Sequence, residues 1–173
     1  KSGNNLNIKN KYNYTILMYA SEYNNSEIVQ LLLDNKVDID YVGYDGNTAL
    51  HIACRFGNTE IVRLLIDAGA DLNKKDNHKN TPLLIAAKYE YLNIVKILTN
   101  VGANVNVKNS NNESDDNGYT PLMYASLKNN INIAKILLAN GAEIDTKGAF
   151  GYTALIIASF NNNTKLIELL MKY

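Results

Sequence analysis

Few side chains in this sequence could act as a nucleophile, a general base or a soft metal ligand. There are two histidines, His51 and His78, and one cysteine, Cys54. A lone cysteine cannot form an intramolecular disulfide or a site of several thiolates, so Cys54 fits a reducing compartment. The chain has no glycine-rich phosphate loop, no HExxH-type motif and no nucleophile paired with a base in the sequence.

Carboxylates are the other groups that could do chemistry, by holding a cation or transferring a proton. Two pairs stand close in sequence, Asp38 with Asp40 and Asp115 with Asp116. Both lie in predicted loops, where solvated turn residues explain them better than a metal site. The sequence therefore predicts no catalytic residue, no metal ligand, no cofactor and no enzymatic activity.

The overall charge gives no preference for a charged partner. Seventeen basic and seventeen acidic residues cancel in a chain of 173 residues, and 46% of the residues are hydrophobic. This composition is normal for a folded protein, and it gives no net attraction to nucleic acid or an anionic membrane. No apolar run is long enough to span a bilayer, and the polar, Asn-rich start shows no signal peptide. We expect an intracellular, cytoplasmic protein.

Internal repeats dominate the sequence. Five segments begin with a threonine and align without gaps, and the spacings of these threonines are 33, 33, 39 and 33 residues: Thr15–Ser21, Thr48–Cys54, Thr81–Ala87, Thr120–Ser126 and Thr153–Ser159. A second apolar segment follows each of them in step: 27–33, 60–66, 93–99, 132–138 and 165–171. Three of these second segments reach a Gly-Ala pair: Gly69-Ala70, Gly102-Ala103 and Gly141-Ala142.

Local chemistry gives each repeat the same expected structure. Threonine is a good helix N-cap, and Pro82 and Pro121 occupy the first helical position. A small alanine in each first helix allows close packing, and the second helix carries a one-sided apolar stripe. Gly69 stands where a helix ends in a left-handed residue. Each unit therefore reads as helix, turn, helix and hairpin loop, and the units must stack to form a core.

These features resemble the ankyrin repeat family, which has a 33-residue period and a Thr-Pro-Leu-His-x-Ala signature. Residues 48–53 depart from that signature only at Ala49, and the Gly-Ala-Asp-Leu-Asn run at 69–73 is also similar to the family pattern. The resemblance covers essentially the whole chain. It implies an all-α fold, an ankyrin repeat α-solenoid of stacked helix-turn-helix units with short β-hairpin loops. The Trp/Gly/Tyr pattern of tetratricopeptide repeats is absent.

The phase of the repeat predicts one domain over residues 1–173. Its repeats fall at about 10–42, 43–75, 76–108, 115–147 and 148–173. Residues 1–9 align with the end of a repeat, which predicts the tail of an upstream unit and a fragment of a longer array. The spacing of 39 places a six-residue insertion at 109–114, either a tolerated bulge or a finger that contacts a partner.

The resemblance also assigns structural roles to two of the reactive side chains. In the family the signature histidine bonds to loop backbone, so His51 is expected to be structural rather than catalytic. Met18, Leu84, Met123 and Ile156 replace it elsewhere, and those loops are expected to be held by packing. Cys54 occupies an Ala/Ser position and is expected to be a small buried residue rather than a nucleophile.

The family resemblance implies a scaffold that binds a protein partner through its concave face and hairpin fingers. Most aromatic residues fall at loop or helix-end positions expected to be exposed or half exposed, and Tyr and Arg are favoured binding residues. The candidate partner-binding residues are Tyr12, Tyr14, Tyr23, Tyr44, Arg55, Phe56, His78, Lys88, Tyr89, Tyr119, Phe150 and Tyr152. We place Tyr44, Phe56 and Tyr89 at the centre, although each aromatic could instead pack on a neighbouring loop.

Other interpretations remain open. The chain could be the recognition module of a larger adaptor or enzyme-targeting protein, without catalysis of its own. A modest basic strip on the second helices (Arg63, Lys96, Lys135) could contact nucleic acid, and Asn73 and Asn106 lie in contexts like those that asparaginyl hydroxylases use in this family. We expect a monomer whose partner is a protein, and not nucleic acid, a membrane or a small-molecule substrate.

Overall fold

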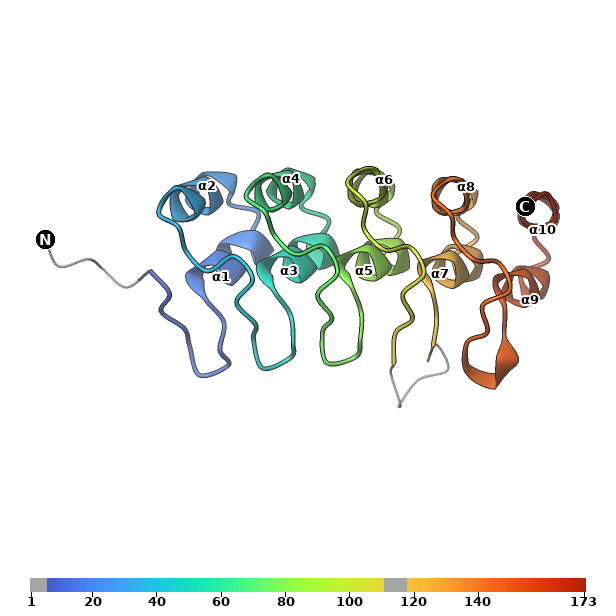
Figure 1. The fold of residues 1–173 in the computed structure, drawn as a ribbon, viewed down its shortest axis with the longest axis horizontal. Helices are drawn as coiled ribbons and strands as arrows, with labels where there is room; N and C mark the ends of the chain where they lie inside the picture. The colour runs from blue at the N-terminus through green and yellow to red at the C-terminus, as the bar shows by residue number, and fades with distance from the viewer. Residues whose placement is uncertain (1–5, 111–117) are drawn as a thin grey trace, which may run out of the picture.

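The computed structural model describes residues 6–110 and 118–173, in which ten α-helices follow one another in pairs (Figure 1). The pairs are α1 (Ile16–Glu22) with α2 (Ser26–Asp34), α3 (Ala49–Phe56) with α4 (Thr59–Asp67), α5 (Pro82–Lys88) with α6 (Leu92–Asn100), α7 (Pro121–Leu127) with α8 (Ile131–Ala139), and α9 (Ala154–Phe160) with α10 (Thr164–Leu170). A single 3-10 turn, η1 (Ala149–Gly151), precedes α9.

The helices lie in two layers. The first helices of the pairs (α1, α3, α5, α7, α9) pack side by side in one layer, and the second helices (α2, α4, α6, α8, α10) form the other (Figure 1). The hairpin loops between pairs project from the first layer, on the side away from the second helices. This arrangement confirms the predicted all-α solenoid.

One continuous apolar core runs through the stacked pairs. The predicted small residues Ala53, Ala86 and Ala125 are fully buried between neighbouring first helices, as is Cys54. A larger side chain at these positions would separate the helices, because protein interiors are close-packed. The stacking therefore depends on small residues in the first layer and on the apolar stripe of the second.

The predicted helix signals are present. All five threonines cap a first helix, each hydroxyl accepting a hydrogen bond from the amide three residues on: Thr15, Thr48, Thr81, Thr120 and Thr153. Pro82 and Pro121 occupy the first helical turn. Gly69, Gly102 and Gly141 have φ of 90°, 87° and 84°, as expected for residues that end a helix in the left-handed conformation.

The hairpin loops share one closing hydrogen bond. In four of them the amide of the first residue donates to the carbonyl four residues later: Asn10 to Tyr14, Gly43 to Asn47, Asp76 to Asn80 and Gly148 to Tyr152. In the longer loop Asn109 donates to Tyr119. One such bond is too few to make a ladder, so the described residues contain hairpin-shaped loops without strands, apart from a single bridge between Lys9 and Thr15.

Bonds between neighbouring loops fix their register. The amides of Tyr44, Asn77 and Ser110 donate to the carbonyls of Tyr12, Asp45 and His78, at 3.3, 3.1 and 2.7 Å. Asn109 and Ser110 are therefore regular repeat positions, equivalent to Asp76 and Asn77. The bounds of the insertion, 109–114, stay a prediction. Its remainder, 111–114, and the pair Asp115 and Asp116 lie outside the described residues.

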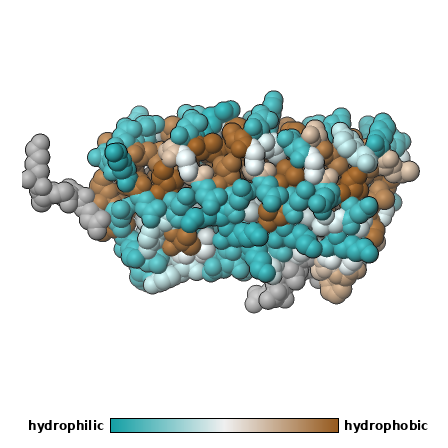
Figure 2. Space-filling view, viewed as in Figure 1, coloured by the Kyte–Doolittle hydropathy of each residue, from teal (hydrophilic) through white to brown (hydrophobic). Residues whose placement is uncertain are grey.

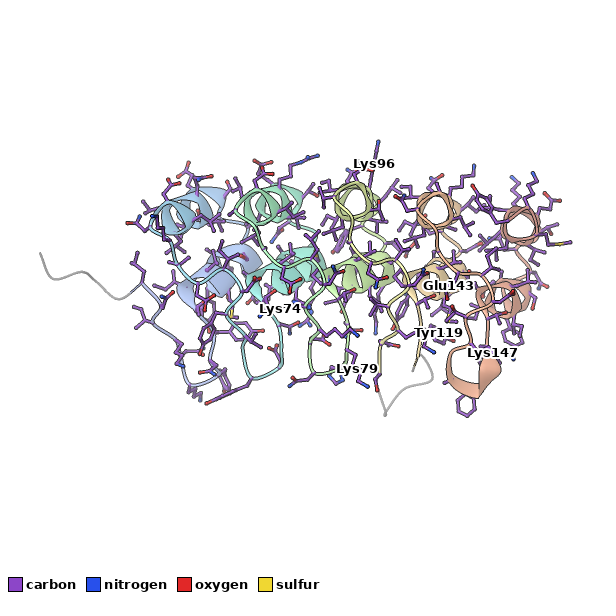
Figure 3. All side chains as sticks on the ribbon, viewed as in Figure 1. Lys74, Lys79, Lys96, Tyr119, Glu143 and Lys147 are labelled. Atoms are coloured by element: carbon purple, nitrogen blue, oxygen red, sulfur yellow. The ribbon has the colours of Figure 1, made fainter. Side chains whose placement is uncertain are left out.

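A second set of bonds links the polar loops that follow the second helices. A side-chain oxygen of one loop accepts the backbone amide of the next: Asn7 from Asp38, Asp40 from Asp71, Asn73 from Asn104 and Asn106 from Glu143. These loops contribute to the hydrophilic band along the middle of the face in Figure 2, where Lys74 and Glu143 also lie (Figure 3). Asp38 and Asp40 are thus loop-forming residues, as predicted.

Candidate functional site

Two pockets lie where the hairpin loops meet the first helices, and together they form what we call the hairpin groove. The tyrosine pocket, about 420 Å³, is lined by Asn10, Tyr12, Tyr14, Tyr19, Glu22, Tyr44 and Asp45. The basic pocket, about 200 Å³, is lined by Arg55, Asp76, His78, Asn80, Ile85, Lys88, Tyr89 and Asn109. Each pocket spans successive loops, so neither could form on a single repeat.

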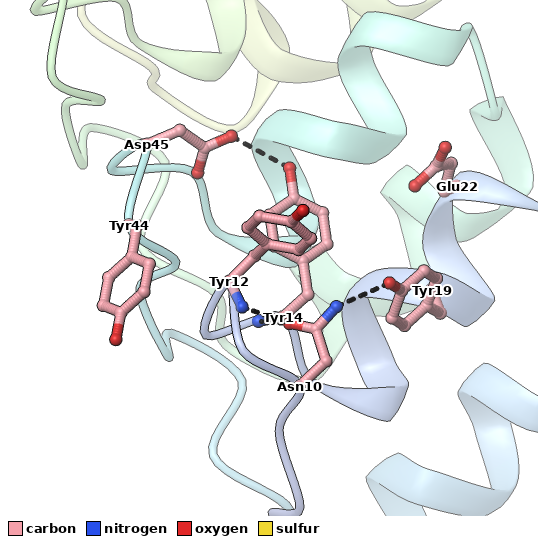
Figure 4. Close-up of a pocket in the computed structure, with 7 residues that line it drawn as sticks. All are labelled: Asn10, Tyr12, Tyr14, Tyr19, Glu22, Tyr44 and Asp45. Carbon is pink, nitrogen blue, oxygen red and sulfur yellow. Dashed lines mark hydrogen bonds between the residues drawn. The ribbon is translucent and has the colours of Figure 1, made fainter.

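Hydrogen bonds fix two rings of the tyrosine pocket (Figure 4). The Tyr14 hydroxyl donates to Oδ2 of Asp45 at 2.9 Å, and Nδ2 of Asn10 donates to the Tyr19 hydroxyl at 2.7 Å. The Tyr14 and Tyr19 rings meet edge to face with their centroids 5.9 Å apart. Edge-to-face contact is a favoured arrangement of aromatic rings. The position of both rings is therefore determined before any ligand binds.

Two carboxyl groups, Asp45 and Glu22, make this pocket acidic. Burial acts to raise the pKa of the Asp45 carboxyl, but hydrogen bonds from Asn47 and Tyr14 and the nearby Arg55 charge outweigh it and lower the pKa. Burial and the bond to Asp45 raise the pKa of Tyr14 to about 12, so this hydroxyl keeps its proton. In the described part of the chain, no hydrogen bond reaches the half-exposed Glu22 carboxylate.

The basic pocket has the opposite character. Its one acidic group, Asp76, is buried and accepts bonds from the His78 amide at 2.9 Å and from the amide and side chain of Asn80, both at 2.8 Å. This carboxylate therefore holds the loop. Arg55 donates to Oδ1 of Asn47 at 3.2 Å, and Lys88 lies 5.3 Å above the Tyr124 ring.

The structure brings most of the predicted binding residues into the hairpin groove. Tyr12, Tyr14 and Tyr44 line the tyrosine pocket, and Arg55, His78, Lys88 and Tyr89 line the basic pocket. Tyr23 and Phe56 are exposed but line neither pocket. Phe150 and Tyr152 form a separate cluster with Phe160 on the last pair, with ring centroids 6.2 and 5.6 Å apart.

The expectation that Tyr119 is exposed or half exposed is wrong. Only 6% of this residue is accessible, and its ring packs edge to face on Tyr124 at 5.5 Å. Its amide donates to Oδ1 of Asn109 at 2.6 Å. Tyr119 therefore closes the longer loop against the core and is not available to a partner.

The sequence did not identify Tyr19 and Asp45 as groove residues. Tyr19 stands at the position of the buried Ile52 and Ile85, so the repeat pattern predicts core, yet 41% of it is accessible. Asp45 stands at a variable loop position whose residue type carries no repeat signal. A tyrosine in place of isoleucine does not predict this exposure, because Tyr124 stands at the same position in the fourth pair and is buried.

The structural roles predicted for His51 and Cys54 are confirmed. His51 is buried; its Nδ1 accepts from the Thr48 amide at 3.2 Å, and its Nε2 lies 3.1 Å from the Asn80 carbonyl. These partners place the proton on Nε2, from which it bonds to the next loop. Burial lowers the pKa of His51 and raises that of the Cys54 thiol, so Cys54 is not a reactive thiolate.

Comparison with known proteins agrees with these repeats. The family model described as "Ankyrin repeats (3 copies)" matches residues 2–76, 43–109, 68–148 and 107–173. These matches overlap, so the number of five repeats stays a prediction. No curated protein matches the chain. Over the described ranges no helix is long and apolar enough to cross a membrane, and no three His, Cys, Asp or Glu residues group as metal ligands.

Proposed function

The chain belongs to the ankyrin repeat family, and on this premise we propose that it binds a protein partner along the hairpin groove. Ankyrin repeats are generally protein–protein interaction modules, and the family is typically a non-catalytic binding scaffold. The proposal names the surface of this chain that makes the contact, which is where the loops meet the first helices.

One observation supports the proposal above all: the groove exposes large aromatic side chains that are not among the buried core residues. Tyr12, Tyr44 and Tyr89 are 57%, 67% and 48% accessible, and all three line its pockets. Aromatic residues and arginine are enriched in the energetic centres of interfaces, because they bury a large area with few rotatable bonds. Arg55, which lines the basic pocket, adds a hydrogen-bond donor to this surface.

We further propose that the chain has no catalytic activity and acts alone as a monomer or as the recognition module of a larger protein. The buried, hydrogen-bonded His51 and the buried Cys54 support this, because neither can reach a substrate. The balanced charge supports a protein partner over nucleic acid or an anionic membrane. A reducing, intracellular location is consistent with the unpaired Cys54 thiol.

The test compares partner capture by two triple variants. Tyr12→Ala/Tyr44→Ala/Tyr89→Ala removes the three exposed tyrosines on which the proposal rests, and Leu31→Ala/Val101→Ala/Met171→Ala removes comparably exposed apolar groups outside the groove. Proteins captured from cell extract by the wild type are quantified by mass spectrometry. The groove variant should lose at least about tenfold of specific capture, and the control should lose little.

Thermal unfolding of the same variants separates binding from packing. Both triple variants should keep the wild-type midpoint within a few degrees, because exposed side chains contribute little to stability. If the groove variant unfolds early, its aromatics are packing residues. Equal capture by both variants would show that the partner binds elsewhere.

A further inference from the structure

The tyrosine pocket stands out from the rest of the hairpin groove by its ring content. Four tyrosines line it, and two of them, Tyr14 and Tyr19, are held in place by hydrogen bonds (Figure 4). Tyr12 and Tyr44, from successive hairpin loops, are the most exposed of the four, at 57% and 67% against 41% for Tyr19. The arrangement gives a fixed inner pair of rings and a more exposed outer pair that a ligand can reach.

Its charge is the second distinguishing feature. Glu22 and Asp45 are the ionisable groups besides the tyrosines among the lining residues, and both are acidic. Two cations adjoin it without being among its lining residues: Arg55 donates to Asn47, and the Lys11 ammonium lies 4.9 Å from the centre of the Tyr12 ring. By contrast, the neighbouring basic pocket is lined by Arg55, His78 and Lys88.

Tyrosine faces and carboxylates attract the same kind of group. The face of an aromatic ring is the negative part of its quadrupole, and it attracts ammonium and guanidinium groups. A carboxylate adds Coulombic attraction and accepts their N–H bonds. The Lys11 ammonium, 4.9 Å from the centre of the Tyr12 ring, shows that an exposed tyrosine of this pocket attracts a cation.

We propose that the tyrosine pocket receives a cationic side chain, arginine or lysine, from an exposed segment of the protein partner. The inference rests on the proposed function, because it names the partner chemistry that one part of the hairpin groove selects. The volume of about 420 Å³ is large enough to enclose such a side chain. The same cation is disfavoured in the basic pocket, so the two pockets orient a bound segment by charge.

Blocked amino acids test the pocket without any knowledge of the partner. The probes are N-acetyl amides of arginine, lysine, norleucine and glutamate, added to the full chain and followed by the backbone amide shifts of Asn10, Tyr14 and Asp45. Arginine or lysine should shift these amides in a saturable, salt-sensitive way, while norleucine and glutamate should not. The ratio of the affinities for the arginine and lysine probes shows whether the pocket prefers a guanidinium or an ammonium group.

Substitutions in the pocket distinguish the contribution of its carboxylates from that of its aromatic rings. Glu22→Gln removes a carboxylate that holds no hydrogen bond in the described residues, and it should weaken cation binding about three- to fivefold. Tyr44→Leu should weaken it by a similar factor, whereas Tyr44→Phe keeps the ring and should bind like the wild type. Tyr173→Leu, which removes an equally exposed tyrosine far from this pocket, is the matched control and should change nothing.

Three results would overturn the inference: equal shifts from norleucine and arginine, shifts centred outside the pocket, or unchanged binding in both Glu22→Gln and Tyr44→Leu. None of these would affect partner capture through the groove, which the triple variants test separately. Conversely, the chain could bind the cationic probes and yet capture no partner. That result would support the pocket chemistry and contradict the proposed function.

Discussion

At the scale of single residues, position 51 shows how one side chain joins two repeats. The His51 ring bonds its own capping residue through Nδ1 and the next loop through Nε2. Met18 and Met123 stand at the same position, and their sulfurs accept the capping amides of Thr15 and Thr120 at 3.5 and 3.4 Å. The thioether therefore replaces the bond to the capping threonine but not the bond to the next loop. From the sequence, packing alone was expected to hold these loops.

The free energy of unfolding should depend on pH through His51. The pKa of His51 is lowered in the folded state by burial, so the unfolded chain binds the proton more readily. The contribution of His51 to stability is thus complete above about pH 6.5, and it is lost as the pH falls below that value towards the folded pKa. The free energy of unfolding should decrease there by up to about 1.4 kcal/mol per pH unit.

His51→Met, which installs the residue of the first and fourth pairs, is the matched variant. At pH 7.5 it should be about 1 kcal/mol less stable than the wild type, because it loses the bond to the Asn80 carbonyl. At pH 5 the difference should shrink, since methionine does not titrate. Urea unfolding at both pH values measures this, and parallel pH curves for the two proteins would contradict it.

At the scale of the elements, the hairpin loops all place a residue in the left-handed region directly before their last residue. These residues are Asn13, Gly46, Lys79, Gly118 and Gly151. A Cβ on Gly46 would lie 2.4 Å from the Asn77 amide nitrogen, so only glycine fits there. Lys79, in the third loop (Figure 3), adopts a φ of 58°. Its side chain makes this left-handed conformation less favourable than it would be for glycine.

Replacement of Lys79 by glycine should therefore stabilise the protein. A non-glycine residue in the left-handed conformation costs about 1 kcal/mol, and Lys79→Gly removes most of that cost. The expected gain is about 0.5–1 kcal/mol in chemical denaturation. Lys75→Gly is the control: Lys75 has no positive φ, so the added freedom of the unfolded chain should make this variant neutral or less stable. A loss at both positions would contradict the prediction.

At the scale of the whole molecule, the core is made by neighbours rather than by any one repeat. The leucine two residues after each capping threonine is equivalent in every pair, yet Leu50 and Leu83 are buried while 37% of Leu155 is accessible. Leu155 belongs to the last described pair, which has a neighbour on one side only. The same residue in the same helix thus contributes differently according to its place in the stack.

Alanine substitution should reproduce this gradient. Leu50→Ala or Leu83→Ala should each lower the free energy of unfolding by about 2–5 kcal/mol, because a cavity remains in a packed interior. Leu155→Ala should cost less than half as much, because water fills part of the space. Urea titrations with m held common measure the three values. Equal losses for Leu83→Ala and Leu155→Ala would contradict the stacking argument.

The repeat, its helices and their caps could be predicted from the sequence, because they follow from local chemistry. Threonine at an N-cap, proline in the first turn and glycine after a helix act within a few residues, and the structure keeps them at the predicted places. The roles of His51 and Cys54 also followed, through the family resemblance. About half of the groove could be predicted in the same way, since Tyr12, Tyr44 and Tyr89 stand at loop and helix-end positions.

The sequence could not predict which of the equivalent residues face solvent, because this depends on how the repeats stack. Tyr19 and Tyr124 occupy the same position in different repeats, yet Tyr19 is 41% accessible and Tyr124 is 1% accessible. Tyr119 and Lys88 contact the Tyr124 ring, whereas Tyr19 joins the tyrosine pocket. Exposure depends on the adjoining repeat, which local sequence does not contain. For that reason the pairing of Glu22 and Asp45 with four tyrosines became visible only once the loops were stacked.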